Sequence, residues 1–170
     1  MRSFSGLAVI LVCLSLSSCA GYRLGPTNGM VAGSRSVRVN LFENKTLEPR
    51  LTEALGIALR RTLQQDGTYR LNTQGEGDVV VSGVLTGYER LGLSFQPKDI
   101  LSVRDFEIRL HAKVTAVERG SGRVILEQEV QGRTSLRPGS DFASAERQAV
   151  PLLAEDLARN ITSLLVDGSW

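Results

Sequence analysis

The chain has 170 residues, of which 42% are hydrophobic and 22% charged, a composition that excludes wholesale disorder and is typical of one folded domain. Its 20 basic and 18 acidic residues give a formal net charge of +2, and aromatic residues make up 5%. This balance argues against the strong basic field of most nucleic-acid-binding proteins, and the scarcity of aromatic residues argues against a base-stacking surface. We therefore expect no nucleic-acid partner.

The N-terminus has the three parts of an export signal. Arg2 supplies positive charge, residues 4–16 form an apolar stretch, and Ser17 and Ser18 are small residues that end it. The apolar stretch is shorter than the roughly 20 residues that a bilayer-spanning helix needs. A buried N-terminal helix would need neither the charged start nor the small-residue end. The pattern therefore predicts a cleaved signal peptide over residues 1–18.

The two cysteines of the chain are Cys13, within the apolar stretch, and Cys19, directly after it. Cleavage before Cys19 leaves one cysteine, so no internal disulfide is expected. The run Leu16-Ser17-Ser18-Cys19 resembles the lipobox of bacterial lipoproteins, which is a leucine, two small residues and a cysteine. The resemblance implies that the Cys19 sulfur carries a diacylglycerol and that its new amine is acylated.

Lipidation at Cys19 sets the expected location. More than one acyl chain gives durable membrane anchoring. Ala20 follows the cysteine, where many lipoproteins retained at the inner membrane have aspartate. The resemblance therefore implies an anchor in the inner leaflet of the outer membrane, with the protein on the periplasmic side. These covalent acyl groups are the only cofactor-like groups that we expect.

The mature chain is expected to form a tether followed by a single domain over residues 37–166 and a short tail over residues 167–170. Residues 19–36 are rich in Gly, Pro, Ser, Asn and Thr and lack periodicity, which predicts the lipidated tether. Residues 37–42 alternate apolar and polar side chains, which predicts a half-buried strand.

A first helix is predicted after this strand. Thr46 or Glu48 is suited to cap it, Pro49 suits its first turn, and Asp66 with Gly67 is expected to end it. Its predicted apolar stripe consists of Leu51, Leu55, Ala58, Leu59 and Leu63.

Three longer strands are predicted next, over residues 78–91, 106–117 and 124–136. Glycines in the first of these suggest a bend or bulge. The second alternates regularly and is joined to the third by a tight turn over residues 118–123, with Val124, Leu126 and Val130 expected on one face of the third. The predicted register places Thr115 opposite Glu127 and Lys113 opposite Glu129.

A second helical region is predicted over residues 141–166, with Pro151 expected to kink it or divide it into two helices. Its apolar residues at helical spacing are Ala145, Ala149, Leu152, Leu153, Leu157, Ile161, Leu164 and Leu165. The order strand, helix, three strands, helix predicts an α+β fold. We expect a four-stranded, antiparallel-dominated or mixed sheet with two helices packed on one face.

The sequence offers no constellation typical of an enzyme, so no catalytic residue, metal site or catalytic cofactor is predicted. His111 is the only histidine and is expected on the solvated side of its strand between basic neighbours. With Cys19 lipidated, no zinc site can be assembled. No Gly-rich phosphate-binding run occurs. Glu127 and Glu129 could form a carboxylate pair, but Lys113 opposite them explains them as a charged face.

Two short motifs carry a resemblance to a known family. The start of the mature chain has Cys19, Gly21, Tyr22 and Leu24, and residues 42–63 read FENKTLEPRLTEALGIALRRTL. Together with the order of elements, these resemble the LptE family, the lipoprotein partner of the LptD β-barrel. The resemblance implies a protein that binds and plugs the LptD barrel, helps it assemble and so assists lipopolysaccharide assembly at the cell surface. It leaves open whether this chain contacts lipopolysaccharide directly.

Four basic residues are candidates for such a contact, because lipid A carries phosphates. Lys98 and Arg104 flank a predicted loop over residues 96–104, and Arg133 and Arg137 lie near the end of the paired strand. Antiparallel order would bring all four to the same end of the hairpin. The alternative is that they are ordinary solvated charges.

Two other functions are compatible with the sequence. Residues 42–63 also resemble the small α+β domain of TolB-type proteins and of lipoproteins that activate peptidoglycan synthases. That function requires a long tether across the periplasm. A tether over residues 20–36 spans at most about 60 Å, which is short for this purpose. A lipid-tethered hydrolase would need a pocket with convergent titratable groups.

Overall fold

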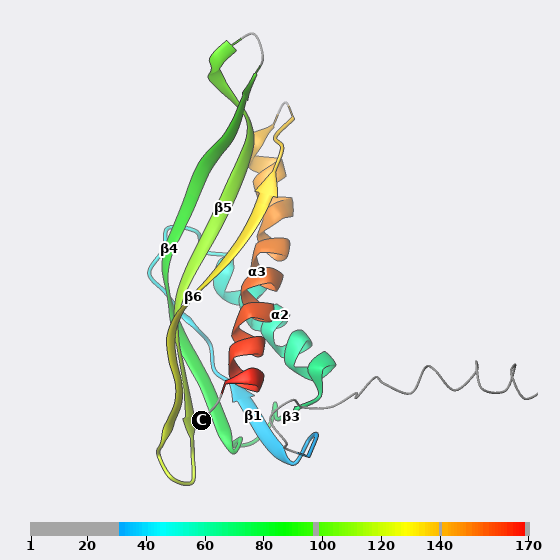
Figure 1. Ribbon diagram of the computed structural model, residues 1–170, viewed down its shortest axis with the longest axis vertical. Helices are drawn as coiled ribbons and strands as arrows, with labels where there is room; N and C mark the ends of the chain where they lie inside the picture. Colours follow the sequence, from blue (N-terminus) through cyan, green and yellow to red (C-terminus); the bar gives the residue numbers. More distant parts are fainter. Residues whose placement is uncertain (1–30, 97–98, 140, 169–170) are drawn as a thin grey trace, which may run out of the picture.

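The computed structural model describes residues 31–96, 99–139 and 141–168, with side chains placed outside residues 95–104. Cys19 and the other lipobox residues lie outside the described residues. The described chain forms a long, strongly twisted sheet with two helices packed against one of its faces (Figure 1). The α+β class and the two-layer arrangement are therefore as predicted.

The sheet has six strands rather than the four predicted. They are β1 (Arg35–Val39), β2 (Glu43–Asn44), β3 (Tyr69–Leu71), β4 (Val79–Gln96), β5 (Asp99–Glu118) and β6 (Val124–Leu136). The order across the sheet is β3-β1-β4-β5-β6, with β2 paired to β4. β1 pairs in parallel with β3 and β4, β2 in parallel with β4, and β4, β5 and β6 are antiparallel, so the sheet is mixed.

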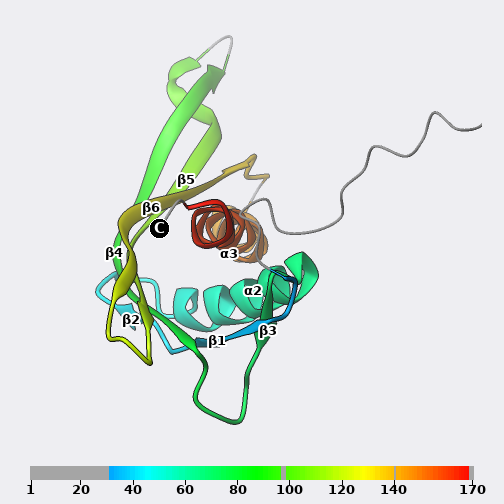
Figure 2. The same cartoon turned by 60° about the horizontal axis from the view of Figure 1, so that its bottom comes forward.

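The two helices are α2 (Leu51–Asp66) and α3 (Phe142–Asp167), and Figure 2 shows them side by side over the same face of the sheet. α2 ends as predicted, because Gly67 adopts the left-handed conformation with φ 76° and donates its N–H to the Leu63 carbonyl. The predicted start is wrong. Arg50 is the N-cap and makes no side-chain cap, while Thr46 and Glu48 belong to a turn that Asn44 organises.

The strand boundaries differ from the predictions at both ends of the sheet. β1 begins at Arg35, inside the segment predicted as tether, and ends at Val39 rather than at residue 42. The predicted loop over residues 96–104 is mostly strand, because β5 begins at Asp99 and pairs with an extension of β4 that reaches Gln96. The boundaries predicted for β6 are confirmed.

The predicted register of the β5–β6 hairpin is confirmed: Thr115 pairs with Glu127 and Lys113 with Glu129. The bulge predicted in β4 is also present, as a register shift between Leu85 and Gly87. The face predicted for Val124 is wrong, since its side chain is 51% exposed while Ile125 is buried. A register shift between Ala116 and Val117 changes which side chains at this end of β6 face the core.

The core lies between the sheet and the helices. β5 contributes Ile108, Leu110, Ala112, Val114 and Ala116, which alternate along the strand and are fully buried as predicted. α2 contributes Leu51, Leu55, Leu59 and Leu63, and α3 contributes Ala149, Leu153, Leu157, Ile161 and Leu165. Leu152 was expected in this stripe but is 56% exposed. Because it directly precedes Leu153, it points to another side of the helix.

α3 is one continuous helix that contains Pro151, rather than two shorter helices. Its start is capped by Asp141, whose side chain accepts from the Ala143 N–H at 3.0 Å. Proline has no N–H, so the Arg147 carbonyl lacks its usual α-helical donor. The helix continues because apolar residues on both sides of the proline are buried against the sheet and α2.

α3 also protects the edge of the sheet at β6. Asp156 accepts a hydrogen bond from the Arg133 backbone N–H at 2.9 Å, and the Asn160 amide donates to the Gln131 carbonyl at 2.8 Å. These side chains form hydrogen bonds with backbone groups of β6 that would otherwise be free to pair with a strand of another chain.

Candidate functional site

The candidate site is the distal hairpin, which we define as the paired ends of β4 and β5 from Leu91 to Glu107. The last pair between β5 and β6 is Phe106 with Leu136, whereas β4 and β5 remain paired until Gln96 and Asp99. The distal hairpin therefore extends beyond β6 and beyond α3, as the upper part of Figure 1 shows. It is a two-stranded projection, whose shape suits it to contact a partner.

Of the four predicted contacts, one is not placed by the structure and another is placed by its backbone alone. Lys98 lies outside the described residues, and Arg104 lies in β5 with its side chain outside them. Arg137 directly follows β6, and its Nε donates to Asp105 Oδ1 at 2.5 Å. This hydrogen bond raises the pKa of Arg137 further above its usual value, so the guanidinium stays charged. The structure thus brings Arg137 beside the residue that follows Arg104.

Arg133 lies further along β6 and is paired in register with Arg109 of β5. Arg109 makes an ion pair with Glu107 at 2.6 Å, whereas Arg133 has no ion pair among the described residues. Two cations directly opposite on neighbouring strands repel each other. Because Glu107 and the cross-strand neighbour Glu89 already offset the charge of Arg109, Arg133 is the guanidinium of this pair that is left to bind an anion such as a phosphate. Sequence reasoning named Arg133 but missed Arg109, whose role depends on the register.

The base of the distal hairpin is joined to α3 by a polar cluster. Tyr88 donates from its hydroxyl to Glu146 Oε1 at 2.6 Å, and Arg90 makes an ion pair with the same oxygen. Arg90 also lies over the Tyr88 ring, 5.1 Å from its centre. This cluster was not predicted, because its members come from elements far apart in the sequence.

The pKa values in this cluster follow from burial and from these hydrogen bonds. Burial and then the bond to Glu146 raise the pKa of Tyr88 well above its usual value. Burial acts to raise the pKa of Glu146, but hydrogen bonds from Arg90 and Tyr88 outweigh it and hold that pKa below its usual value. Beside the cluster, Phe106 and Phe142 pack edge to face with ring centres 5.0 Å apart. The start of α3 is thereby fixed to the sheet.

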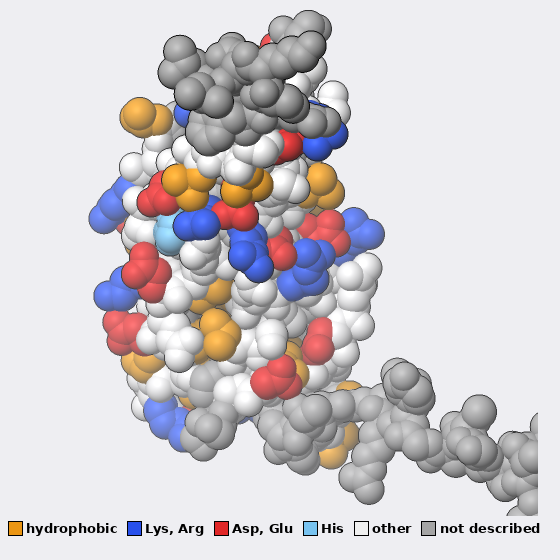
Figure 3. Space-filling model, turned by 45° about the horizontal axis from the view of Figure 1, so that its top comes forward, with side chains coloured by type: hydrophobic (Ala, Val, Ile, Leu, Met, Phe, Trp, Pro, Cys, Tyr) orange, Lys and Arg blue, Asp and Glu red, His pale blue; other side chains and the backbone are white. Residues whose placement is uncertain are grey.

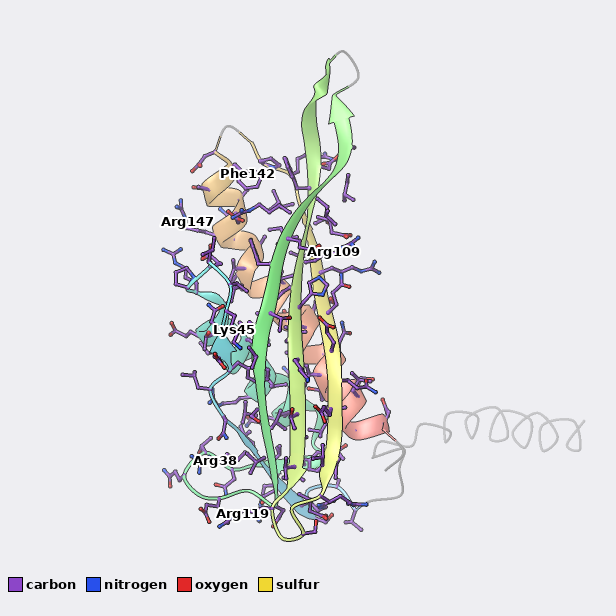
Figure 4. The ribbon with its side chains drawn as sticks, turned by 90° about the vertical axis from the view of Figure 1, so that its left-hand side faces the viewer. Arg38, Lys45, Arg109, Arg119, Phe142 and Arg147 are labelled. Atoms are coloured by element: carbon purple, nitrogen blue, oxygen red, sulfur yellow. The ribbon has the colours of Figure 1, made fainter. Side chains whose placement is uncertain are left out.

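The second surface of interest is the outer face of the sheet, which we define as the side opposite the helices. It carries Glu89, Arg109, His111, Lys113, Glu127, Glu129 and Arg133. Figure 4 shows Arg109 projecting from the sheet away from α3. Lys113 pairs with Glu127 at 3.5 Å, and His111 Nε2 lies 3.9 Å from Glu89. The carboxylates expected opposite Lys113 are therefore part of a charged face.

Acidic and basic side chains are interspersed on the face that Figure 3 turns toward the viewer. Within the described residues, no group of His, Cys, Asp and Glu side chains is arranged to hold a metal ion. Neither helix in residues 31–168 is long and apolar enough to cross a membrane.

Comparison with solved structures defines the fold class. A hypothetical protein from Chlamydia trachomatis matches with a TM-score of 0.57 and 13% identity, covering 78% of this chain and 96% of that one. A protein from Xanthomonas campestris matches with a TM-score of 0.57 and 13% identity over 85% and 91% of the two chains. A minor lipoprotein from Acinetobacter baumannii has a TM-score of 0.50 and 14% identity over 78% and 93%. At these identities the comparison shows that the α+β fold is shared.

The sequence itself identifies the family. The model of the LptE lipopolysaccharide-assembly family matches residues 34–165, which is most of the chain. The chain therefore belongs to the LptE family, as the short motifs predicted. No curated protein matches this chain in sequence.

Proposed function

We propose that this protein is an outer-membrane lipoprotein, anchored through Cys19 on the periplasmic side, that binds and plugs an LptD-type β-barrel and helps it to assemble. Through this barrel it assists the assembly of lipopolysaccharide at the cell surface. Its role is binding rather than catalysis. The observation that carries the proposal is the match of the LptE family model over residues 34–165.

The outer face of the sheet supports a role inside a barrel. A barrel lumen is lined by polar side chains, so a plug needs an exposed surface of mixed charge. The side chains of Lys113, Glu127 and Glu89 on the outer face are all more than half exposed. We propose that the part of this face around Lys113, Glu127 and Glu129 lies against the lumen wall, while the helices and the buried side of the sheet form the structural core.

The arginines near the base of the distal hairpin support the proposal that the protein contacts lipopolysaccharide directly. Arg133 and Arg109 lie opposite each other, and Arg137 adds a third guanidinium bound to Asp105. We propose that these groups, together with Lys98 and Arg104, bind the phosphates of lipid A. Lipopolysaccharide would then be bound at the end of the plug from which the distal hairpin projects.

Affinity purification of the full-length, membrane-anchored protein tests the proposal. The LptD-type barrel should co-purify in mild detergent, and the charge reversal Lys113→Glu on the outer face should reduce its recovery. Arg159→Glu is the matched control, because Arg159 is exposed on α3, which packs on the other side of the sheet. Recovery of a peptidoglycan synthase in place of the barrel would contradict the proposal and favour the synthase-activator function.

A further inference from the structure

The two helices leave a groove between them that contains no residue of the distal hairpin. Its cavity volume is about 470 Å³, within the range of small-molecule sites. All of its lining residues belong to α2, to α3 or to Arg50 at the start of α2. The sheet and its charged outer face contribute nothing to it, so the groove is a separate feature of the molecule.

The interior of the groove is apolar. Val150 is buried, and Ala54 and Ala58 are half-buried at the contact between the helices. Ile57 and Pro151 lie at the mouth, where the Ile57 side chain is 62% exposed. Water in contact with these side chains would be released if an apolar chain occupied the groove.

The rim of the groove carries more unpaired positive than negative charge. Arg50 and Arg61 have no ion-pair partner among the described residues, whereas Arg147 makes an ion pair with Asp141 at 3.9 Å and donates to Ser144 Oγ at 2.7 Å. Of the two carboxylates on the rim, Glu155 is paired with Arg159 of its own helix at 3.4 Å, which leaves Glu53. An anionic head group above an apolar chain would complement this arrangement.

We propose that the groove between α2 and α3 binds a single acyl chain that carries a phosphate group. The chain would lie on Ala54, Ala58 and Val150, and the phosphate would be bound by Arg61. This site goes beyond the proposed function. It is distinct from the proposed lipid A contacts, which are Lys98, Arg104, Arg109, Arg133 and Arg137, and it does not depend on the barrel partner.

The shape of the groove favours an individual amphiphile over a membrane surface. Docking onto a bilayer needs a protruding apolar face that can enter the head-group region. Here the apolar residues form a recess, and Ile57 is the one large apolar side chain of its lining that is mostly exposed. A recess of this kind surrounds one chain.

Photo-crosslinking tests the proposal on the full-length protein in phosphatidylcholine nanodiscs. The probe is dodecyl phosphate with a diazirine near the end of its chain, and peptide mass spectrometry locates the crosslinks. We expect crosslinks within residues 50–65 and 147–155. Ile57→Ser and Arg61→Glu should each lower their yield about tenfold, as expected for loss of an apolar contact or a charge-assisted hydrogen bond.

Two matched variants and two further probes complete the experiment. Leu152→Ser removes an equally exposed apolar side chain outside the groove, and Arg70→Glu reverses a remote charge, so both should keep the yield. Circular dichroism verifies that each variant is folded. Equal crosslinking by a dodecyl trimethylammonium probe, or by a diazirine phosphatidylcholine in the bilayer, would overturn the proposal. Unchanged yield in Ile57→Ser and Arg61→Glu would overturn it too, while co-purification of the barrel would be unaffected.

Discussion

Gly132 of β6 lies directly against Leu157 of α3. A Cβ atom at position 132 would come within 2.6 Å of the Leu157 Cβ and 2.7 Å of its backbone nitrogen. Because backbone atoms cannot move aside as a flexible side chain can, a glycine at this point lets the helix approach the strand closely. The contact sets the distance between α3 and the edge of the sheet.

Gly132→Ala should therefore destabilise the protein, because the added methyl group forces α3 away from β6. The expected loss in free energy of unfolding is about 1–3 kcal/mol, which is typical of overpacking. Urea unfolding followed by circular dichroism measures it. Gly139→Ala is the control, since a Cβ there meets nothing within 4 Å. Equal stability of the two variants would contradict the close approach of helix and strand.

The cluster of Tyr88, Arg90 and Glu146 predicts a pH dependence of stability. The pKa of Glu146 is lower in the folded protein than its usual value, so its contribution is present above about pH 4.3 and is lost as the pH falls through the folded pKa. Glu146→Gln should be less stable than the wild type at pH 7, and the difference should shrink by pH 3.

Urea unfolding at both pH values measures this difference. Glu155→Gln is the control, because Glu155 is exposed and makes an ion pair only with Arg159 of the same helix. An equal difference between wild type and Glu146→Gln at pH 7 and pH 3 would show that the carboxylate charge does not hold α3 to the sheet.

The basic residues at the distal end should contribute additively to lipopolysaccharide binding. Replacing Lys98, Arg104, Arg133 and Arg137 together by glutamate should weaken binding at least about tenfold, because each removes a charge that attracts phosphate. Binding of purified protein to immobilised lipopolysaccharide at two salt concentrations measures this loss. Reversal of Arg119 and Arg123, at the opposite end of the β5–β6 hairpin, should have little effect. Equal losses in both sets would indicate non-specific attraction.

Mass spectrometry of the protein purified from bacterial membranes tests the anchor. The mature N-terminus should begin at Cys19 and carry a diacylglycerol and an additional acyl group, which increase the mass accordingly. Cys19→Ala should leave the protein unlipidated. A wild-type chain with an uncut start, or with a free thiol at Cys19, would contradict the predicted location.

Much of the fold could be predicted from the sequence because its main elements have strong local patterns. The central part of β5 alternates regularly, and the tight turn that joins it to β6 fixes the register that pairs Lys113 with Glu129. β2 and β3 could not be predicted, because strands of two and three residues are too short to show a period and form only through pairing with β4 and β1.

Tertiary contacts also explain the features that were predicted wrongly from local sequence patterns. Pro151 was expected to kink α3 or divide it into two helices, and the buried residues around it keep the helix undivided. Residues 99–104 were expected to belong to a loop, but they are strand because β4 extends to pair with β5. The strand propensity of a segment predicts its structure poorly where a neighbouring strand supplies the hydrogen bonds.

The sequence allowed the basic residues of the candidate site to be predicted, but not the residues that they contact. Arg133 and Arg137 could be named because basic residues near a hairpin end are visible in the sequence. Their relation to Arg109 and Asp105 depends on strand register, and the bond between Tyr88 and Glu146 joins residues 58 positions apart. Only the folded structure brings such residues together.

Depletion of the protein from growing cells tests the central claim most directly. The measurement is the amount of folded LptD-type barrel in the outer membrane, followed on gels that separate its folded and unfolded forms. We predict that the folded barrel falls to a small fraction of its normal level and recovers when the wild-type protein is restored. Folded barrel at its normal level in depleted cells would contradict the account.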